Sequence, residues 1–534
     1  MSTPSARKPP VRVFENYNNA KHVIVPHHAS EGDSIRFLGS VSARSHCERK
    51  CIKSTVRCFS YVYLKPARGH PGECYSVTTP NWNPAFDPSA DSGIIRWPCR
   101  NDEECSLNGR CVQGTCDCRA AWHGHRCEKL SLLPPRQGVG YRAIDDGRNT
   151  SSWGAAVLLG PDGLHHMWVS EMTGHCGIGT WVHNSRIVHA TSASAGGSYV
   201  RKDITWPVFA HEPVVVPGPN GEFVMFFTGR PRNGKFSDKH QTGYCDCCRS
   251  RGSRCDGSTG PGDCPSDAAK RDPTATDHPP STYMSWTNDP NGNWSNPRQV
   301  FSHYKGGDTN FSPLILANGS LVGLWRRWSW GGGSRVFVAT ATDWREPATY
   351  QMHRYRTLEN DKAPSKKRAA KGQTRIRNAE LFPDLGPAGA EDQFLYMDSD
   401  GNYHAVFHNM VGTDTKDHWW LLATGGHAWS RDGWNWTYTG VAWGNATARS
   451  DLPNEQGAFV TYRDGSPAHF TRVERPHLIF AGAALRGDPE WLVSSIQYGG
   501  GMSPTPGGSM NDDASFTLIQ QVRRHKPMAA ARVR

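Results

Sequence analysis

The chain has 534 residues, with 60 Lys and Arg against 49 Asp and Glu and a formal net charge of +11. This length exceeds what one hydrophobic core usually organises, so we expect more than one domain. The positive charge comes without a nucleic-acid recognition motif or a continuous basic helix, which argues against a nucleic-acid partner. No run of about 20 apolar residues is present, which argues against a membrane span.

The excess of basic residues is partly local, in the stretches around Lys366–Arg368 and Val522–Lys526. Solvated loops and a disordered end account for such runs most simply. The alternative is attraction to an acidic polymer, such as a uronate or sulfated polysaccharide.

The N-terminal part begins with MSTPSARKPPVRVF, which has no apolar core of a signal peptide. We expect residues 1–20 to be disordered. Residues 21–95 resemble the PAN/apple pattern, on Cys-Phe-Ser-Tyr at 58–61 and on the spacing of Cys47, Cys51, Cys58 and Cys74. That resemblance implies a module that binds protein or carbohydrate, for example a cell-wall or extracellular protein. A disulfide-stapled spacer is the alternative.

Residues 96–130 contain six cysteines spaced C-x5-C-x5-C-x4-C-x1-C-x8-C, with Trp122 and Gly124 between the last two. The segment is too short for a core of its own and needs covalent staples. It resembles an EGF-like domain, which implies the bridges Cys99–Cys111, Cys105–Cys116 and Cys118–Cys127. The residues before the first cysteine are not acidic, so we expect no calcium here. A single C-x-C without paired CxxC motifs argues against zinc.

Cysteine usage indicates the compartment. The chain has 16 cysteines, in groups of four, six and six along the sequence. Even groups in short spans predict disulfides and an oxidising compartment. Six N-x-S/T sequons agree with a glycoprotein. We therefore expect a secreted, extracellular protein although no signal peptide is visible.

Five similar units follow. Each starts with an apolar run, and the first four continue through a Gly-containing turn into a second apolar run; they start at residues 153, 211, 310, 391 and 475. Gly supplies the positive φ of tight hairpin turns. Repeated multi-stranded units predict an all-β fold, a five-bladed β-propeller over residues 140–505. Residues 231–280 are a polar, Cys-rich insertion, and 506–534 are a C-terminal strand and basic tail.

The propeller resembles the five-bladed glycoside hydrolase clan that includes family 43. The resemblance is carried by the repeated units, by HATSASAGGSYV at 189–200 and by Glu391-Asp392-Gln393-Phe394. It implies inverting hydrolysis of a glycosidic bond in a plant, algal or cell-wall polysaccharide. In that mechanism one carboxylate activates water, another carboxylic acid protonates the leaving oxygen, and a third group assists.

The candidate catalytic residues are acids at the starts of innermost strands: Glu212, Asp308, Glu391 and Asp392. We expect Asp392 or Glu391 as one partner, Glu212 as the other and Asp308 in assistance. The sequence departs from the family in two places. The first blade has Ser151–Gly154 where the family has an acid, and Ser312 aligns with Glu212 on blade three.

The candidate substrate-binding residues are His211, Trp153, Trp325, Arg326 and His408. Aromatic rings can stack on sugars, although most propeller tryptophans pack between blades. The resemblance also implies an axial His that ligates a structural calcium ion, for which His477 is the matching position. A hydrogen-bonded core His is the alternative.

One further string, Trp286-Thr287-Asn288-Asp289-Pro290-Asn291-Gly292, resembles the nucleophile motif of fructan hydrolases. It falls on a third-strand-to-edge segment rather than on the first blade, so we expect no catalytic role for Asp289. Two functions stay open. One is a secreted glycoside hydrolase, and the other is a non-catalytic carbohydrate-binding or adhesive protein.

Overall fold

The computed structural model describes residues 98–524 with gaps, the longest at 237–279, 358–375, 410–423, 445–457 and 498–513, together with strands between residues 35 and 94. The chain divides into two compact units. One ends at Lys129 and also takes in Tyr438–Val441, and the other runs over the rest of Leu130–Arg524.

The N-terminal unit begins with a four-stranded antiparallel sheet in the order β1-β3-β2-β4. Its strands are β1 (Ile35–Val41), β2 (Ser60–Leu64), β3 (Gly72–Val77) and β4 (Ala90–Ile94). Cys74 on β3 forms a disulfide with Cys47, which fixes the segment after β1 to the sheet. Cys51 and Cys58 of the PAN/apple-like pattern lie outside the described residues.

Three disulfides staple the next segment: Cys99–Cys111, Cys105–Cys116 and Cys118–Cys127. These are the pairs that the EGF-like resemblance implies. Its elements are η1 (Asp102–Cys105), β5 (Gly109–Val112), β6 (Thr115–Cys118), β7 (Trp122–His123) and β8 (Lys129–Leu130). Besides the bridged sulfurs, the small core holds the indole of Trp122, which is buried. The covalent staples therefore do most of the work of a hydrophobic core.

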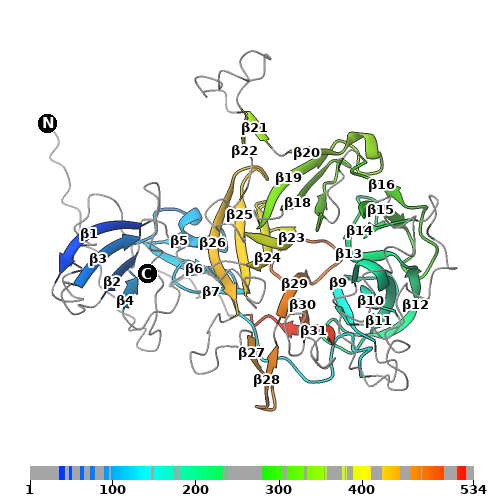
Figure 1. Ribbon diagram of the computed structural model, residues 1–534, viewed down its shortest axis with the longest axis horizontal. Helices are drawn as coiled ribbons and strands as arrows, with labels where there is room; N and C mark the ends of the chain where they lie inside the picture. The colour runs from blue at the N-terminus through cyan, green and yellow to red at the C-terminus, as the bar shows by residue number, and fades with distance from the viewer. Residues whose placement is uncertain are drawn as a thin grey trace, which may run out of the picture. The chain divides into compact units, whose positions relative to one another are not determined.

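Five antiparallel sheets make up the second unit (Figure 1). The first three are β9 (Ser152–Leu159), β10 (His165–Met172), β11 (Ser185–Ser192) and β12 (Val200–Trp206); β13 (Ala210–Pro217), β14 (Phe223–Gly229), β15 (Ser281–Thr287) and β16 (Arg298–Gln299); and β17 (Ser312–Ile315), β18 (Leu321–Ser329), β19 (Gly333–Ala341) and β20 (Gln351–His353). The last two are β23 (Ala390–Met397), β24 (Tyr403–Asn409), β25 (Gly425–Ser430) and β26 (Trp436–Trp443); and β29 (Arg472–Ile479), β30 (Trp491–Gln497) and β31 (Ser515–Gln521).

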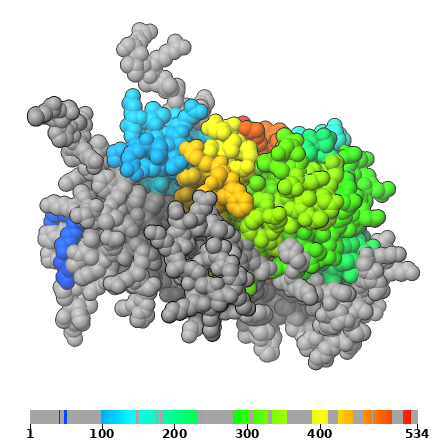
Figure 2. All heavy atoms as spheres, turned by 90° about the horizontal axis from the view of Figure 1, so that it is seen from above, coloured from blue at the N-terminus to red at the C-terminus, as the bar shows by residue number. Residues whose placement is uncertain are grey.

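The innermost strands form a closed ring. Strand β9 contacts β13 and β29, β17 contacts β13 and β23, and β23 contacts β29. In Figure 1 these strands surround the centre of the unit, and in Figure 2 the third blade (green) lies against the fourth (yellow to orange). The all-β fold and the five-bladed propeller predicted from the sequence are confirmed.

The ring closes between the first and last blades. The chain ahead of blade one bridges to the end of blade five, where Tyr141 pairs with Thr517 and Leu132 with Val522. Buried apolar side chains from both blades, such as Val157, Met167 and Val493, share one core cluster. Strand β31 therefore belongs to the fifth blade, and the propeller extends beyond residue 505, where the sequence analysis ended it.

The predicted hairpin turns are present in four blades. Gly163, Gly221, Gly319 and Gly401 have φ between 78° and 90°, the region that glycine enters without steric cost. Smaller elements are α2 (Trp181–Asn184), η6 (Pro347–Thr349), and the hairpins β21 (Tyr355–Thr357) with β22 (Ile376–Asn378) and β27 (Ala458–Thr461) with β28 (Pro467–Phe470). Within the described residues no helix is both long and apolar enough to cross a membrane.

A hydrogen-bonded Asp-His-His chain links the hairpin turn to the second and third strands in two blades. In blade one, His166 lies 2.9 Å from Asp162 and 2.8 Å from His189. In blade four, His404 lies 3.0 Å from His427 and 3.4 Å from Asp398. The hydrogen bond with His166 lowers the pKa of Asp162 to about 2. These Asp-His-His hydrogen bonds therefore stabilise the turn only while Asp162 is ionised.

We expect acid to weaken this turn. The pKa of Asp162 is lower in the folded protein than in the unfolded chain, so its contribution is complete above about pH 4 and is lost as the pH falls through about 2. Thermal unfolding of Asp162→Asn should thus show a smaller loss of Tm than wild type between pH 5 and pH 3. Asp400→Asn, in the exposed turn of blade four, is the control and should behave as wild type. Parallel pH curves for Asp162→Asn and wild type would contradict the prediction.

Candidate functional site

A β-bulge interrupts the innermost strand of the blades near its start. In β13, β23 and β29 two residues oppose one residue of the neighbouring strand, and β9 has a shift at the same place. One bulged residue per blade has positive φ: Gly154, Glu212, Asn310, Asp392 and Arg475, at 58°, 58°, 41°, 58° and 56°. We call these five positions the axial ring. Because non-glycine residues seldom adopt this conformation, its repetition marks a shared functional geometry.

Blade three corrects the sequence alignment. The backbone N–H of Arg326 donates to Thr309, while Ser312 pairs with Leu324. The two residues between Thr309 and Ser312 therefore form the bulge, and Asn310, not Ser312, is the counterpart of Glu212. The sequence alignment was wrong by two residues because the bulge lies just before β17. In blade one the counterpart is Gly154, so no acid stands there.

The axial ring lines one pocket. Its volume is about 360 Å³, which includes part of the open solvent at its mouth. All five ring residues border it, with His477 and Phe394 among the other walls. In blade two Ala210 pairs with Gly229, and Gly229 pairs with Ser281, so the chain leaves and re-enters the blade at the start of β13. Both ends of the Cys-rich insertion therefore lie at the end of the blade that carries the ring. Residues 237–279, which hold the cysteines of the insertion, lie outside the described residues.

Donor groups surround the carboxylate of Glu212. The guanidinium Nη2 of Arg475 contacts its Oε1. Asn310 Nδ2 donates to its Oε2 at 2.9 Å, and His211 Nε2 lies 3.1 Å from Oε1. The backbone N–H of Glu212 donates to Ser170 Oγ at 2.8 Å and fixes the bulge. A carboxyl group that accepts from several donors, one of them cationic, favours its charged form.

His211 supports Glu212 from the side. Its Nδ1 lies 2.6 Å from Ser185 Oγ, and its ring stacks on the half-buried indole of Trp181 at 4.7 Å between centroids. Burial, together with the charge of Arg475, holds the pKa of His211 well below its usual value. A neutral imidazole can still donate its one N–H hydrogen bond to Glu212. Trp181 was not found from the sequence, where its loop carries no repeat pattern.

Asp392 has the opposite tendency. Burial raises its pKa well above the usual value, and the charges of Glu391 and Glu474 add to that shift. The charges of His408 and Arg326 oppose this shift only in part. Arg475 Nε lies 3.0 Å from Oδ1. Asp392 therefore favours a protonated carboxyl at neutral pH, while the donors around Glu212 in the same pocket favour a charged carboxylate. Two carboxyls whose environments separate their pKa values are typical of acid and base pairs.

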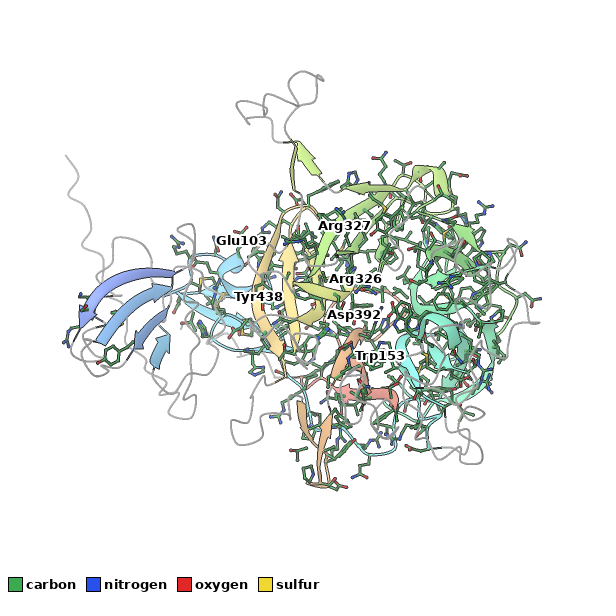
Figure 3. All side chains as sticks on the ribbon, in the orientation of Figure 1. Glu103, Trp153, Arg326, Arg327, Asp392 and Tyr438 are labelled. Atoms are coloured by element: carbon green, nitrogen blue, oxygen red, sulfur yellow. A yellow bond between two sulfur atoms is a disulfide. The ribbon has the colours of Figure 1, made fainter. Side chains whose placement is uncertain are left out.

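Glu391 lies behind Asp392 and is ionised. Burial opposes its ionisation, but the hydrogen bond with His408 at 3.3 Å and the charge of Arg326, whose Nη1 is 2.5 Å away, lower its pKa to about 2. Burial also opposes the charge on His408, but Glu474 and Glu391 raise its pKa to about 9. Figure 3 shows Arg326 and Asp392 together near the centre of the propeller, where these charges converge.

Donor atoms of Glu391, Asp392, His408 and Glu474 all lie within 4.8 Å of one another, the density that a metal ion requires. The surroundings do not fit a cation. Arg326 contacts Glu391, and Arg472 Nε lies 2.9 Å from Glu474 Oε1, so guanidinium groups already neutralise these carboxylates. This group of carboxylates therefore binds arginine side chains rather than a calcium ion.

His477 is not placed as a metal ligand either. Its Nε2 lies 3.1 Å from both the backbone nitrogen and the backbone oxygen of Val157, and its ring packs edge-on against Phe394. Burial lowers its pKa to about 4. The calcium role expected for His477 is therefore unsupported, and its position fits the hydrogen-bonded core alternative. It still forms part of the pocket wall.

Of the remaining predicted residues, Trp153 lies near the axis and Trp325 lies away from it. Trp153 precedes Gly154, is buried, and has the guanidinium of Arg472 5.5 Å from its ring centre. Figure 3 places it beside the axis. Trp325 is fully buried inside blade three and donates its indole N–H to the carbonyl of Val338, so the substrate-binding interpretation gives way to a packing one. Asp308 lies outside the described residues.

Arg475 is the residue that sequence reasoning missed with the largest consequence, since its guanidinium contacts both Glu212 and Asp392. A signal for it exists in the sequence. Glu212-Pro213 in blade two and Arg475-Pro476 in blade five stand in the same place before their apolar runs. Aligning the two prolines would have put Arg475 on the axis.

The known proteins that this chain resembles are solved structures. No protein-family model and no curated protein matches the chain. Zg3597, a family 117 glycoside hydrolase of the marine bacterium Zobellia galactanivorans, matches with a TM-score of 0.41 at 10% identity, over 74% of this chain and 90% of that chain. The α-L-arabinofuranosidase PaAbf62A from Podospora anserina matches with a TM-score of 0.38 at 12% identity, over 77% and 98%. A thermostable family-43 glycoside hydrolase matches with a TM-score of 0.37 at 10% identity, over 74% and 99%. At these identities the activity of this chain has to be argued from its own residues.

Proposed function

We propose that the axial pocket hydrolyses a glycosidic bond with inversion, with Asp392 as general acid and Glu212 as general base. One observation carries the proposal. The two carboxyls occupy equivalent bulged positions on blades two and four, line the same pocket, and have environments that favour opposite protonation states. This is the division of roles that an inverting glycosidase requires.

One guanidinium group bridges the two carboxyls. Arg475 reaches Glu212 through Nη2 and Asp392 through Nε. Inverting hydrolysis needs ~6.5–9.5 Å between the two carboxyls, which leaves room for a water molecule. A retaining pair would stand closer, at about 5–5.5 Å, so that one carboxylate could reach the anomeric carbon itself.

The proposed step balances as follows. Water attacks the anomeric carbon and gives its proton to Glu212 as the new C–O bond forms. The bond to the leaving oxygen breaks, and Asp392 gives that oxygen its proton. Glu212 ends protonated and Asp392 ionised, and exchange with solvent restores both. Glu391, Arg326 and His408 act through Asp392, since the charge of Glu391 keeps its neighbour protonated.

The substrate would be a plant, algal or cell-wall polysaccharide met outside the cell. The disulfides of the N-terminal unit support an oxidising compartment. The PAN/apple-like and EGF-like segments would hold the enzyme to its polymer or to a neighbouring protein. The asparagines in the sequons would carry glycans in such a location. Asn310 is the exception, because its buried side chain donates to Glu212.

A carbohydrate-binding protein without catalysis is the second candidate. It is favoured by Gly154, which leaves blade one without an acid, and by Arg475, which bridges the two remaining carboxyls. In that function the pocket would hold a sugar and the carboxyls would only neutralise arginine.

Product stereochemistry tests the proposal. The full chain should release reducing sugar from at least one member of a panel of plant, algal and uronate polysaccharides. Proton NMR of the first products should show the anomer opposite to that of the bond cleaved. Retention of configuration would contradict the Glu212 and Asp392 pair. Binding to a polymer without any release would favour the second candidate.

A further inference from the structure

The side chain of Arg475 occupies space that blade one leaves empty. A Cβ built on Gly154 would lie 3.5 Å from Arg475 Cδ and 3.8 Å from Glu212 Cγ. Arg475 therefore runs past the position where blade one has no side chain and reaches blade two. With any longer side chain at Gly154 the guanidinium could not follow this path. The missing acid of blade one and the arginine of blade five are thus one arrangement.

That arrangement sets a condition on the substrate. Arg475 spans the gap between Glu212 and Asp392, where the attacking water and the glycosidic oxygen have to sit. For the proposed hydrolysis the guanidinium has to turn aside. Pulling a buried arginine away from its carboxylate without a new partner is strongly unfavourable. A substrate that brings an anionic group of its own would supply that partner.

We propose that the pocket recognises a glycan carrying an acidic substituent, a carboxylate or a sulfate, which pairs with Arg475 in the space beside Gly154. This inference deepens the proposed hydrolase function and rests on it for the catalytic consequence. Arginine suits either group, because its planar donors match two oxygens of a carboxylate or a sulfate. Pairing would draw the guanidinium toward blade one and open the gap between the two carboxyls.

The charges around the axis agree. Among the described side chains of the cluster, the cationic groups belong to Arg326, Arg472, Arg475 and His408, and the carboxyls to Glu212, Glu391, Asp392 and Glu474. With Asp392 ionised the two sets match in number. Protonation of Asp392 leaves one carboxylate fewer than cations. An acidic substituent would restore the match, so its binding should favour the protonated form that the general acid needs.

Isothermal titration calorimetry with two matched ligand pairs tests the inference on the full chain. The first pair is a galacturonate oligosaccharide and its methyl ester, and the second is a sulfated galactan oligosaccharide and its desulfated form. We expect one acidic member to bind roughly tenfold or more tightly than its neutral partner, the strength of a charge-assisted hydrogen bond. The pair that shows the preference identifies the anion.

Two variants locate the effect. Arg475→Gln should abolish the preference for the acidic member, provided that its thermal unfolding shows a folded protein. Gly154→Ala is the second variant. It keeps Arg475 and adds a methyl group at ordinary contact distance, on a backbone that non-glycine residues adopt elsewhere in the ring. It should weaken binding of the acidic ligand several-fold more than binding of the neutral ligand.

Equal binding within both pairs would overturn the inference, as would a preference that survives in Arg475→Gln. These outcomes differ from failure of the proposed function, because the titrations do not require turnover. A preference without hydrolysis would retain acidic-glycan recognition and remove the catalytic role. Hydrolysis restricted to neutral glycans would retain the catalytic role and remove acidic-glycan recognition.

Discussion

Asp392→Asn should lower kcat by about 10²–10⁴, the contribution of a general acid, with little change in KM. Asparagine keeps the size of the side chain and its place beside Arg475, but it has no proton to give to the leaving oxygen. The loss should be much smaller on aryl glycosides whose leaving groups need no protonation. That dependence on the leaving group distinguishes loss of the acid from damage to the pocket.

The pH profile gives a second readout for the same variant. Burial and the charges of Glu391 and Glu474 raise the pKa of Asp392, so wild-type activity should persist at neutral pH and fall as Asp392 ionises. Asp392→Asn should lack this alkaline fall. Asp289→Asn is the matched control, because Asp289 lies in an exposed turn of blade two and its carboxylate accepts from the backbone N–H of Asn291. Full activity in Asp392→Asn, or a comparable loss in Asp289→Asn, would contradict the assignment.

The fold was predictable because its signals are local. Apolar runs joined at Gly163, Gly221, Gly319 and Gly401 specify hairpins, and their repetition specifies blades. The fifth blade was harder, since residues 498–514 separate β31 from β30 in the sequence, and β31 completes its sheet beside residues 132–141, ahead of blade one. Closure of a ring pairs the two ends of the domain, and no local pattern records that pairing.

The site was predictable only in part. Glu212 and Asp392 were found because they precede apolar runs, which is where a propeller brings chains to its axis. Ser312 was aligned with Glu212 in place of Asn310, because the bulge puts the ring residue two positions before the strand. Arg475 was overlooked because the search was for acids. Which carboxyl keeps its proton depends on Glu391 and other charges that converge from several blades, and only the folded chain brings them together.

Glu212→Gln should lower kcat by about 10²–10⁴ as well, but with a different signature. Water has to be activated for every substrate, so the loss should be equally large on natural glycans and on aryl glycosides. The variant should also lose stability, because the charge of Glu212 balances the buried guanidinium of Arg475; breaking such a pair costs on the order of 3–5 kcal/mol. Thermal unfolding measured beside the kinetics separates a folded, inactive variant from an unfolded one.

Glu222→Gln is the control for this prediction. Glu222 lies at the other end of the same hairpin, is buried to a similar extent, and pairs with the half-exposed guanidinium of Arg345. Its variant should share any loss of stability but keep kcat, because it does not border the pocket. If Glu212→Gln lost activity only on natural glycans, Glu212 would act on the leaving group and the roles of the two carboxyls would be exchanged. If Glu212→Gln and Asp392→Asn both stayed active, the axial carboxyls would serve only to neutralise Arg475, and the pocket would be a binding site.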